Sequence, residues 1–303
     1  MSKVWPSAKK HLIPGSGIYP LGYVANGVYS GVKANKNKDI SLVLSPHHPC
    51  LASAVFTKNK FCAAPVQVSK SILENSSGSK PLLGVIVNSG CANACTGSDG
   101  LRDAKEMVSL ADKSKDCIVM STGVIGQKLQ MEKIRAGVKD AIASAGNSHD
   151  HWMAAAQGIM TTDTFPKLIS KEFKTARGVY RMAGWSKGAG MIHPNMATML
   201  SSVFTDCNVS QELLKVAVKN AADRSFNAIS IDGDTSTNDT FAVFANGAAK
   251  MEPITNIKSE EFAQFQSNLT YFATELAKLI VRDGEGATKF VQVKVSVLFL
   301  FSL

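Results

Sequence analysis

The chain has 303 residues, of which 45% are hydrophobic and 19% are charged, and its formal net charge is +9. This balance excludes an intrinsically disordered protein, and the length allows one large α/β unit or two domains. The lysines are scattered, without a basic run or interleaved aromatic residues, so the charge favours a basic surface or anionic small substrates over nucleic acid.

Cysteine usage and hydropathy exclude two further classes. The six cysteines include no C-x-x-C pair, which predicts reduced thiols and no metal site. The only long apolar run, 295–303, is too short to cross a bilayer, so neither a membrane span nor a signal peptide is expected. The first 38 residues carry lysines but no acid, a composition that leans towards an organelle transit segment.

The first half of the chain contains short apolar runs followed by a clear helical repeat. Strands are predicted at 40–44, 82–88 and 117–120. Apolar residues then recur with helical spacing from Met131 to Ile142, and Gly146 closes this predicted helix.

The second half adds two predicted strands and a longer helix. A strand is expected over 196–203, and a helix opened by Ser259 carries apolar residues at helical spacing from Phe262 to Leu279. Valines alternate with polar residues over 291–297, which predicts a strand. Strands and helices mingle without a strict βαβ rhythm or a repeat, which favours sheets covered by helices in a layered α/β body.

Four polar segments rich in small residues follow predicted strands or lie between elements. Ordinary turn chemistry accounts for each one alone, but four such loops on a rigid scaffold are where binding groups gather. They are "NSGCANACTG" (88–97), "STGVIG" (121–126), "MTTDTFPK" (160–167) and "DGDTSTNDT" (232–240).

A fifth segment, "KGAGMIHPNMATML" (187–200), has two interpretations. Its lysine precedes its glycines, so it is not a phosphate-binding P-loop, and no dinucleotide-binding glycine pattern is present. It is either a tight loop that leads into a buried strand or a segment that presents Thr198 as a nucleophile.

The order and content of these motifs resemble the ornithine acetyltransferase family, the bifunctional glutamate N-acetyltransferases of arginine biosynthesis. The resemblance implies a layered αββα sandwich of the self-processing ornithine acetyltransferase and aminopeptidase type. It covers nearly the whole chain, through the five segments above and through "IPGSGIYPLGY" (13–23), "FTKNKFCAAPVQ" (56–67), "SFNAISIDGDTSTNDT" (225–240) and "IVRDGEGATKF" (280–290).

The resemblance implies that the chain cuts itself between Ala197 and Thr198 into an α chain (1–197) and a β chain (198–303). The new N-terminal amine of Thr198 then serves as the base for its own hydroxyl, since such amines have a pKa of about 7.7–8.0. Acetyl would pass from N-acetylornithine to Thr198 and then to glutamate, giving ornithine and N-acetylglutamate.

Further roles follow from the same resemblance. The Thr122 hydroxyl and the Gly123 N–H would form an oxyanion hole for the tetrahedral intermediate. Thr161, Lys187 and Glu285 would contact substrate, together with Thr198, with Lys187 suited to a carboxylate and Glu285 to an ammonium group. The contact assigned to Thr161 could equally fall on another threonine of the 161–164 segment.

The resemblance also bears on cofactors, partners and location. It implies no cofactor or metal, while leaving acetyl-CoA open as a second acetyl donor. It implies small-molecule substrates, association of α and β chains into a heterotetramer of two each, and no nucleic-acid or membrane partner. The histidine in "MIHPNMATML" is typical of fungal, mitochondrial members, which predicts a location in the mitochondrial matrix.

Two departures from the family pattern leave other functions open. Cys91 replaces an asparagine and is expected to be a small buried thiol without a catalytic role. Members of the family continue beyond the equivalent of "FVQVKV" (290–295), so the chain is expected to be truncated at its C-terminus, with an exposed sheet edge there. A self-processing amidohydrolase or aminopeptidase and an inactive fragment therefore remain alternatives.

Overall fold

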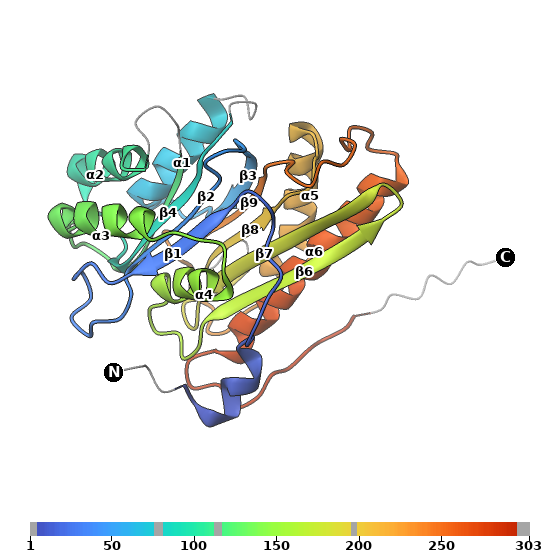
Figure 1. The fold of residues 1–303 in the computed structure, drawn as a ribbon. Coiled ribbons are helices and arrows are strands. Elements are labelled where there is room, and N and C mark those ends of the chain that lie inside the picture. Colours follow the sequence, from blue (N-terminus) through green and yellow to red (C-terminus); the bar gives the residue numbers. More distant parts are fainter. Residues whose placement is uncertain (1–4, 76–80, 112–116, 195–198, 296–303) are drawn as a thin grey trace.

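The structure is a computed structural model that describes residues 5–75, 81–111, 117–194 and 199–295. Two β-sheets form its centre (Figure 1). The first sheet has the order β1-β2-β4-β5, with β1 (Val24–Val28), β2 (Ile40–Leu44), β4 (Gly84–Cys91) and β5 (Cys117–Val124). The second has the order β3-β9-β8-β7-β6, with β3 (Leu51–Phe56), β9 (Thr240–Ala245), β8 (Leu200–Thr205), β7 (Gly178–Lys187) and β6 (Lys167–Thr175).

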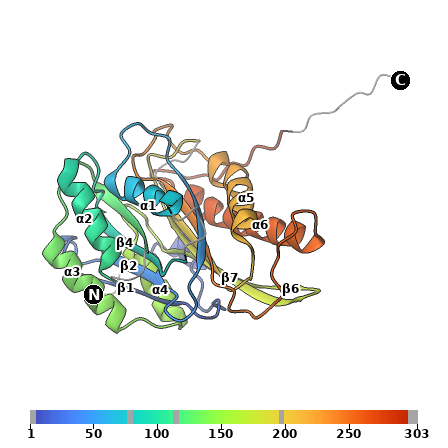
Figure 2. The same ribbon diagram turned by 90° about the horizontal axis from the view of Figure 1, so that it is seen from above.

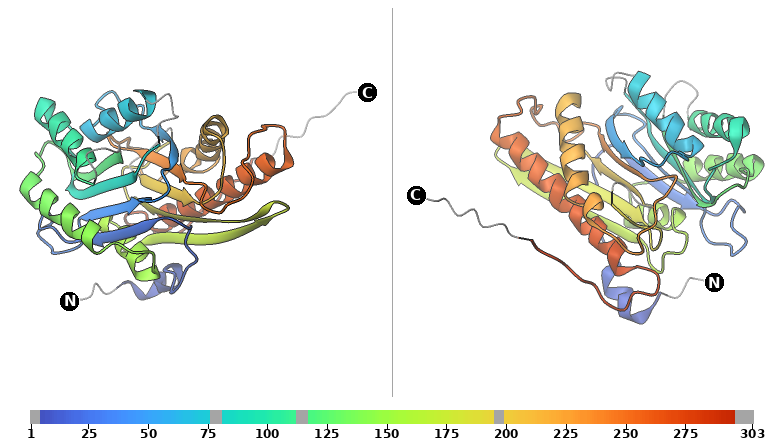
Figure 3. Two further views of the ribbon diagram at one scale, coloured as in Figure 1. Left: turned by 45° about the horizontal axis from the view of Figure 1, so that its top comes forward. Right: turned by 180° about the vertical axis from the view of Figure 1, so that it is seen from behind.

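Helices cover the outer face of each sheet, because each sheet has apolar side chains on both faces. Seen from above, α1 (Ala64–Asn75), α2 (Gly97–Ser109) and α3 (Met131–Ala143) lie over the first sheet (Figure 2). From behind, α5 (Gln211–Asp223) and α6 (Glu260–Arg282) cross the outer face of the second (Figure 3). The two sheets face each other across a separate core, so the predicted αββα sandwich is confirmed.

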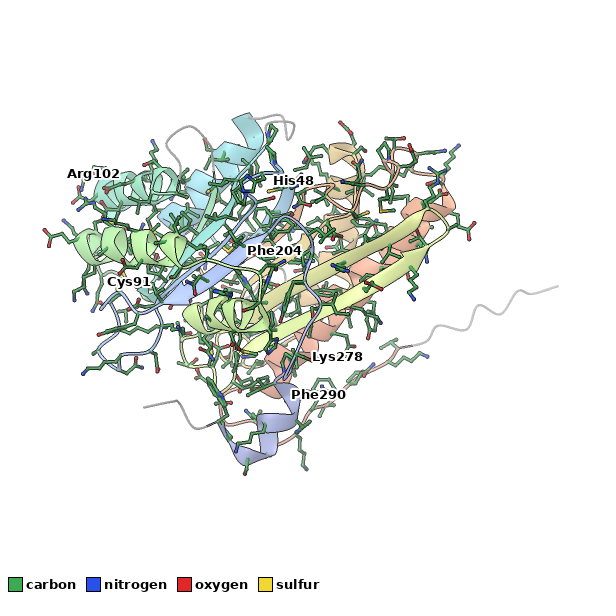
Figure 4. All side chains as sticks on the ribbon, in the orientation of Figure 1. His48, Cys91, Arg102, Phe204, Lys278 and Phe290 are labelled. Atoms are coloured by element: carbon green, nitrogen blue, oxygen red, sulfur yellow. The ribbon has the colours of Figure 1, made fainter. Side chains whose placement is uncertain are left out.

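Aromatic side chains fill the space between the two sheets. Phe204 of β8 lies near the middle of the molecule (Figure 4). Its ring stacks on Phe244 at 5.1 Å between ring centroids and meets Trp152 edge to face at 5.5 Å. Trp152 belongs to α4 (His149–Gly158), which packs against β1 and contributes to the core between the sheets. Two short 3₁₀ helices, η1 (Ser7–Leu12) and η2 (Phe226–Ala228), complete the described elements.

Several predicted elements are confirmed with small shifts at their ends. The strand at 40–44 is β2, and the runs at 82–88 and 117–120 are β4 and β5. Of the predicted 196–203 strand, residues 196–198 lie outside the described residues, and Leu200–Val203 belong to β8. The helix predicted from Met131 is α3, and Ser259 caps α6 by accepting the Phe262 N–H at 3.2 Å. None of the six cysteines forms a disulfide, which agrees with the expectation of reduced thiols.

The predicted strand at 291–297 is wrong over its described part. Residues 291–295 form no strand, and the side chains of Val291, Val293 and Val295 are 71%, 80% and 83% exposed. A strand needs a neighbour for its backbone hydrogen bonds, and this segment leads away from both sheets (Figure 1). Residues 296 and 297 lie outside the described part of the chain. Alternation alone therefore misled the prediction.

Within the described residues, no helix is long and apolar enough to cross a membrane.

We predict that Phe204→Ala destabilises the fold by about 3–5 kcal/mol, because it leaves a cavity where the sheets meet. Phe61→Ala is the matched control, since Phe61 is 73% exposed and its loss should change stability by less than about 0.5 kcal/mol. Urea unfolding followed by circular dichroism measures both. Equal losses of stability in the two variants would contradict the claim that Phe204 stabilises the core between the sheets.

Candidate active site

The four polar loops meet at one end of the sandwich. β4 and β5 are parallel, so their carboxyl ends lie side by side, with Gly90 opposite Gly123. The Asn238 side chain, from the 232–240 loop, donates to the backbone carbonyls of Ala92 at 2.7 Å and Ser121 at 2.8 Å. One amide thus ties three of the loops together, and it is buried.

Thr122 and Gly123 line a small cavity at this meeting point. The cavity has a volume of about 60 Å³ and is lined by Ala92, Thr122, Gly123, Ile125, Met191, Ser236, Thr237 and Asn238. Gly123 has φ +129°, and a Cβ there would lie 2.3 Å from the carbonyl carbon of Gly90, so only glycine fits. The predicted pair of oxyanion donors therefore lies beside a space of suitable size for a small acyl group.

Lys187 ends β7 and points at this pair from the other sheet. Its ammonium group is buried and donates to the Thr122 Oγ1 at 3.2 Å. A hydroxyl that accepts a hydrogen bond from an ammonium keeps its own proton free to donate elsewhere. Burial lowers the pKa of Lys187, while Asp163, Asp239 and Glu285 favour its charged form.

The 160–167 loop reaches the same place through Asp163. This buried carboxylate accepts the Gly188 N–H at 2.9 Å through Oδ1 and the Thr161 N–H at 3.0 Å through Oδ2. Thr164 donates its hydroxyl to Asp283, which gives it a structural role, whereas Thr162 is exposed. Of the three threonines, Thr164 is therefore the least suited to contact substrate.

Glu285 lies on the far side of the 188–190 turn. Its backbone N–H donates to the Ala189 carbonyl at 2.7 Å, and a Cβ on Gly190 would lie 3.0 Å from the Glu285 carboxyl carbon. A side chain at this position would push the exposed Glu285 carboxyl group aside by a few tenths of an ångström, so the glycine permits the close approach. The exposed Glu285 side chain and the buried Lys187 lie on either side of one short turn. The turn therefore brings two of the predicted substrate contacts close together.

Ala197 and Thr198 lie outside the described residues, but Met199, which follows them, is well placed. The Met199 N–H donates to Asp239 Oδ1 at 2.9 Å, and the Thr240 N–H donates to the Met199 carbonyl at 3.1 Å. Burial raises the pKa of Asp239 to about 7, although the Met199 N–H and Lys187 oppose that rise. Among the described residues, Asp239 Oδ2 has no hydrogen-bond partner.

Sequence reasoning missed three residues that organise this site: Asp163, Asn238 and Asp239. All three stand in segments singled out for their small polar residues, where an acid or amide looks like a turn former. The one feature that could have identified them is that each lies close in sequence to a buried strand, where a polar side chain is itself buried and needs specific hydrogen-bond partners. Cys91 is buried as expected, and its thiol donates to the Gln127 carbonyl at 2.9 Å.

Comparisons with known proteins identify the family of the chain. The ArgJ family model matches residues 24–297. The arginine biosynthesis bifunctional protein ArgJ, mitochondrial, of Sordaria macrospora is 55% identical over 299 residues, which are 96% of this chain and 63% of that protein. The chain thus spans less than two thirds of the length of this curated relative.

Two solved structures extend the comparison. The Mycobacterium tuberculosis ornithine acetyltransferase, complexed with ornithine, is 31% identical with a TM-score of 0.50, over 60% of this chain and 97% of that chain. The L-aminopeptidase D-Ala-esterase/amidase of Ochrobactrum anthropi, described as a variant of the Ntn hydrolase fold, matches 92% of this chain and 91% of its own with a TM-score of 0.53. Because the two sequences are only 12% identical, this structural similarity is evidence for the fold alone.

We predict that Asp239 makes the fold less stable as pH rises from about 4 to 7. The folded state keeps a proton that the unfolded state loses near pH 4, so stability falls by up to about 1.4 kcal/mol per pH unit in this window. Asp239→Asn should remove this component, so the stability difference between the wild type and the variant should decline with pH and level off above pH 7.

Urea unfolding at several pH values measures this difference, with the chain composition of each sample checked by mass spectrometry. Asp223→Asn is the control, because Asp223 is exposed and Lys219 lowers its pKa. A flat difference for Asp239→Asn between pH 4 and 7 would contradict the prediction.

Proposed function

The chain belongs to the ArgJ family, and on that premise we propose that it is a self-cleaving acyltransferase that moves acetyl from N-acetylornithine to glutamate. The observation that carries the proposal is the contact between the buried Lys187 ammonium and the Thr122 hydroxyl beside Gly123. It joins a cation for a substrate carboxylate to two donors for an acyl oxyanion. The mitochondrial name of the fungal relative supports a mitochondrial location.

Self-cleavage would begin when the Thr198 hydroxyl attacks the carbonyl carbon of Ala197. The peptide nitrogen leaves as the α-amine of Thr198, and water then hydrolyses the resulting ester. The products are an α chain, 1–197, and a β chain, 198–303. A supporting observation is that 97% of the matched tuberculosis chain corresponds to only 60% of this chain, as expected if that protein is cut into two chains.

The two chains would stay together after cleavage because they share a sheet. β8 and β9 of the later chain lie side by side in the second sheet, between β3 on one side and β7 on the other. Lys187 at the end of β7 is paired with Leu200 at the start of β8, two residues after Thr198. Separating the chains would break two strand pairings, β3 with β9 and β7 with β8, and would expose the core between the sheets. A heterotetramer of two α and two β chains stays a prediction.

Acetyl transfer would use the same hydroxyl twice. With its amine as base, Thr198 attacks the acetyl carbon of N-acetylornithine, and ornithine leaves with the proton. The amine of glutamate then attacks the acetyl ester and releases N-acetylglutamate. Thr122 and Gly123 would hold the oxyanion in both steps, while Lys187, Glu285 and Thr161 bind the amino-acid part. No cofactor takes part in these steps, and acetyl-CoA as a second donor stays a prediction.

Lys187 and Glu285 also bear on the alternative of a hydrolase. An amidohydrolase needs only water as acceptor, whereas a cation and an acid around one turn suit the carboxylate and ammonium of an amino acid. The arrangement therefore favours transfer over hydrolysis.

We predict that Thr198→Ala leaves the chain uncut, because one hydroxyl is needed for the attack on Ala197. The wild type should give two bands on denaturing electrophoresis, with masses expected for 1–197 and 198–303. Thr255→Ala, at an exposed position, is the control and should be cut like the wild type. Intact-mass detection of the two chains in Thr198→Ala would overturn the role of Thr198.

We further predict that N-acetylornithine alone adds one acetyl group to the 198–303 chain. Thr122→Val should slow this step about 100-fold or more, because it removes one oxyanion donor while keeping the side-chain shape. Mass spectrometry of the isolated β chain over time measures both rates. Transfer to glutamate without any trapped acetyl-enzyme would argue for direct attack instead.

A further inference from the structure

A cluster of buried charges lies beneath the active-site turn. Lys167, at the start of β6, donates to Asp163 Oδ1 at 2.5 Å and to Asp283 Oδ2 at 2.7 Å, and all three side chains are inaccessible to solvent. Lys9 of η1 adds a second cation, 2.8 Å from Asp283 Oδ1. Such a cluster is costly to desolvate, so its retention calls for a reason beyond stability.

Each carboxylate of the cluster holds a segment of the proposed site. Asp163 accepts the N–H groups of Gly188 and Thr161, the first of which directly follows Lys187. Asp283 accepts the Thr164 N–H at 2.9 Å and stands two residues before Glu285. The cluster thus joins the 160–167 loop, the 187–190 turn and the end of α6, which together carry the proposed amino-acid contacts.

Two charged groups of the cluster, Asp163 and Lys167, also act electrostatically on the Lys187 ammonium. The charged groups that act on Lys187 are Asp163 and Lys167 of the 160–167 segment, Asp239 of the 232–240 loop, and Glu285. Burial alone disfavours the ammonium, Lys167 disfavours it further, and the three carboxylates favour it. Asp163 is ionised because Lys167 and Lys187 outweigh the effect of its burial and hold its pKa well below the usual value.

We propose that Asp163 is a positioning residue that keeps Lys187 charged and aimed at Thr122, and that Lys167, itself held by Asp283, keeps Asp163 ionised and in place. A charged Lys187 donates to the Thr122 Oγ1, so the Thr122 proton is left to meet the developing oxyanion. A neutral amine could accept that proton and turn it away from the acyl oxygen. The proposal rests on the proposed acyl transfer, and it adds a second role for Lys187 besides binding a carboxylate.

The test uses two variants that act in opposite directions. Asp163→Asn keeps an acceptor for the Gly188 N–H but removes a negative charge, so the basic limb of the kcat profile should move down by about one pH unit. Lys167→Met removes a positive charge, so the limb should move up by about the same amount. Damage to packing would lower both rates without moving the limbs apart.

A direct titration of Lys187 makes the test independent of activity. The 13Cε signal of Lys187, in protein labelled at lysine and assigned by its loss in Lys187→Gln, should titrate lower in Asp163→Asn and higher in Lys167→Met. The double variant Asp163→Asn/Lys167→Met leaves no unpaired charge from this pair and should fold even where a single variant does not. Its titration should lie between those of Asp163→Asn and the wild type.

Asp223→Asn and Lys219→Met are matched controls from an exposed ion pair of α5, and neither should move the Lys187 titration. Shifts in the same direction, or an unmoved Lys187 signal in both cluster variants, would overturn the proposal. If the wild type transfers acetyl but the Lys187 signal does not move in the cluster variants, this inference is rejected and the proposed function stands. Opposite shifts without any self-cleavage or transfer in the wild type support the charge cluster and reject the proposed function.

Discussion

One buried ammonium group governs the arrangement of this end of the molecule. Lys187 has almost no access to water, and an isolated charge in such a place would lose its proton. Three carboxylates from three segments compensate it, and each of them is also tied to the backbone of a neighbouring segment or stands beside it. The requirement to compensate the charge therefore fixes the relative positions of the loops as well. The same contacts that make the ammonium tolerable make the site rigid.

The site depends equally on how the two sheets are stacked. Thr122 and Gly123 come from the first sheet, whereas Lys187 and the start of β8 come from the second. No single sheet contains both halves, so the core between the sheets, to which Phe204 belongs, holds the two halves of the site together. Asn238 ties the two strands together, because its amide donates to the carbonyl of Ala92, just after β4, and to the carbonyl of Ser121 within β5. Core packing and site geometry are thus one problem.

Local periodicity was enough to predict those elements whose signal is complete within a few residues. The β2 run, the α3 repeat and the Ser259 cap of α6 are of this kind, since a strand face, a helix face or a cap needs no distant partner to be recognised. The order of strands in the second sheet could not be predicted, because β3 pairs with β9 from nearly two hundred residues away. The family motifs named Thr122, Gly123 and Lys187, which the fold brings together. Asp163 and Asp239 escaped notice because a buried acid is recognised only by the cation or N–H that faces it.

The wrong prediction of a strand at 291–297 shows what an alternating sequence pattern cannot establish. Perfect alternation is a condition on one strand, whereas a sheet is a condition on two, and the described valines at 291, 293 and 295 have no neighbouring strand to cover them. β8 meets the second condition on both sides, with β7 antiparallel to it and β9 parallel. Its backbone is therefore held at every residue from Leu200 onwards, while the Met199 N–H before it goes to a carboxylate instead of a strand. A strand anchored in this way can be cut just before its first residues without losing its place, and that is the property that a nucleophile at a new N-terminus needs.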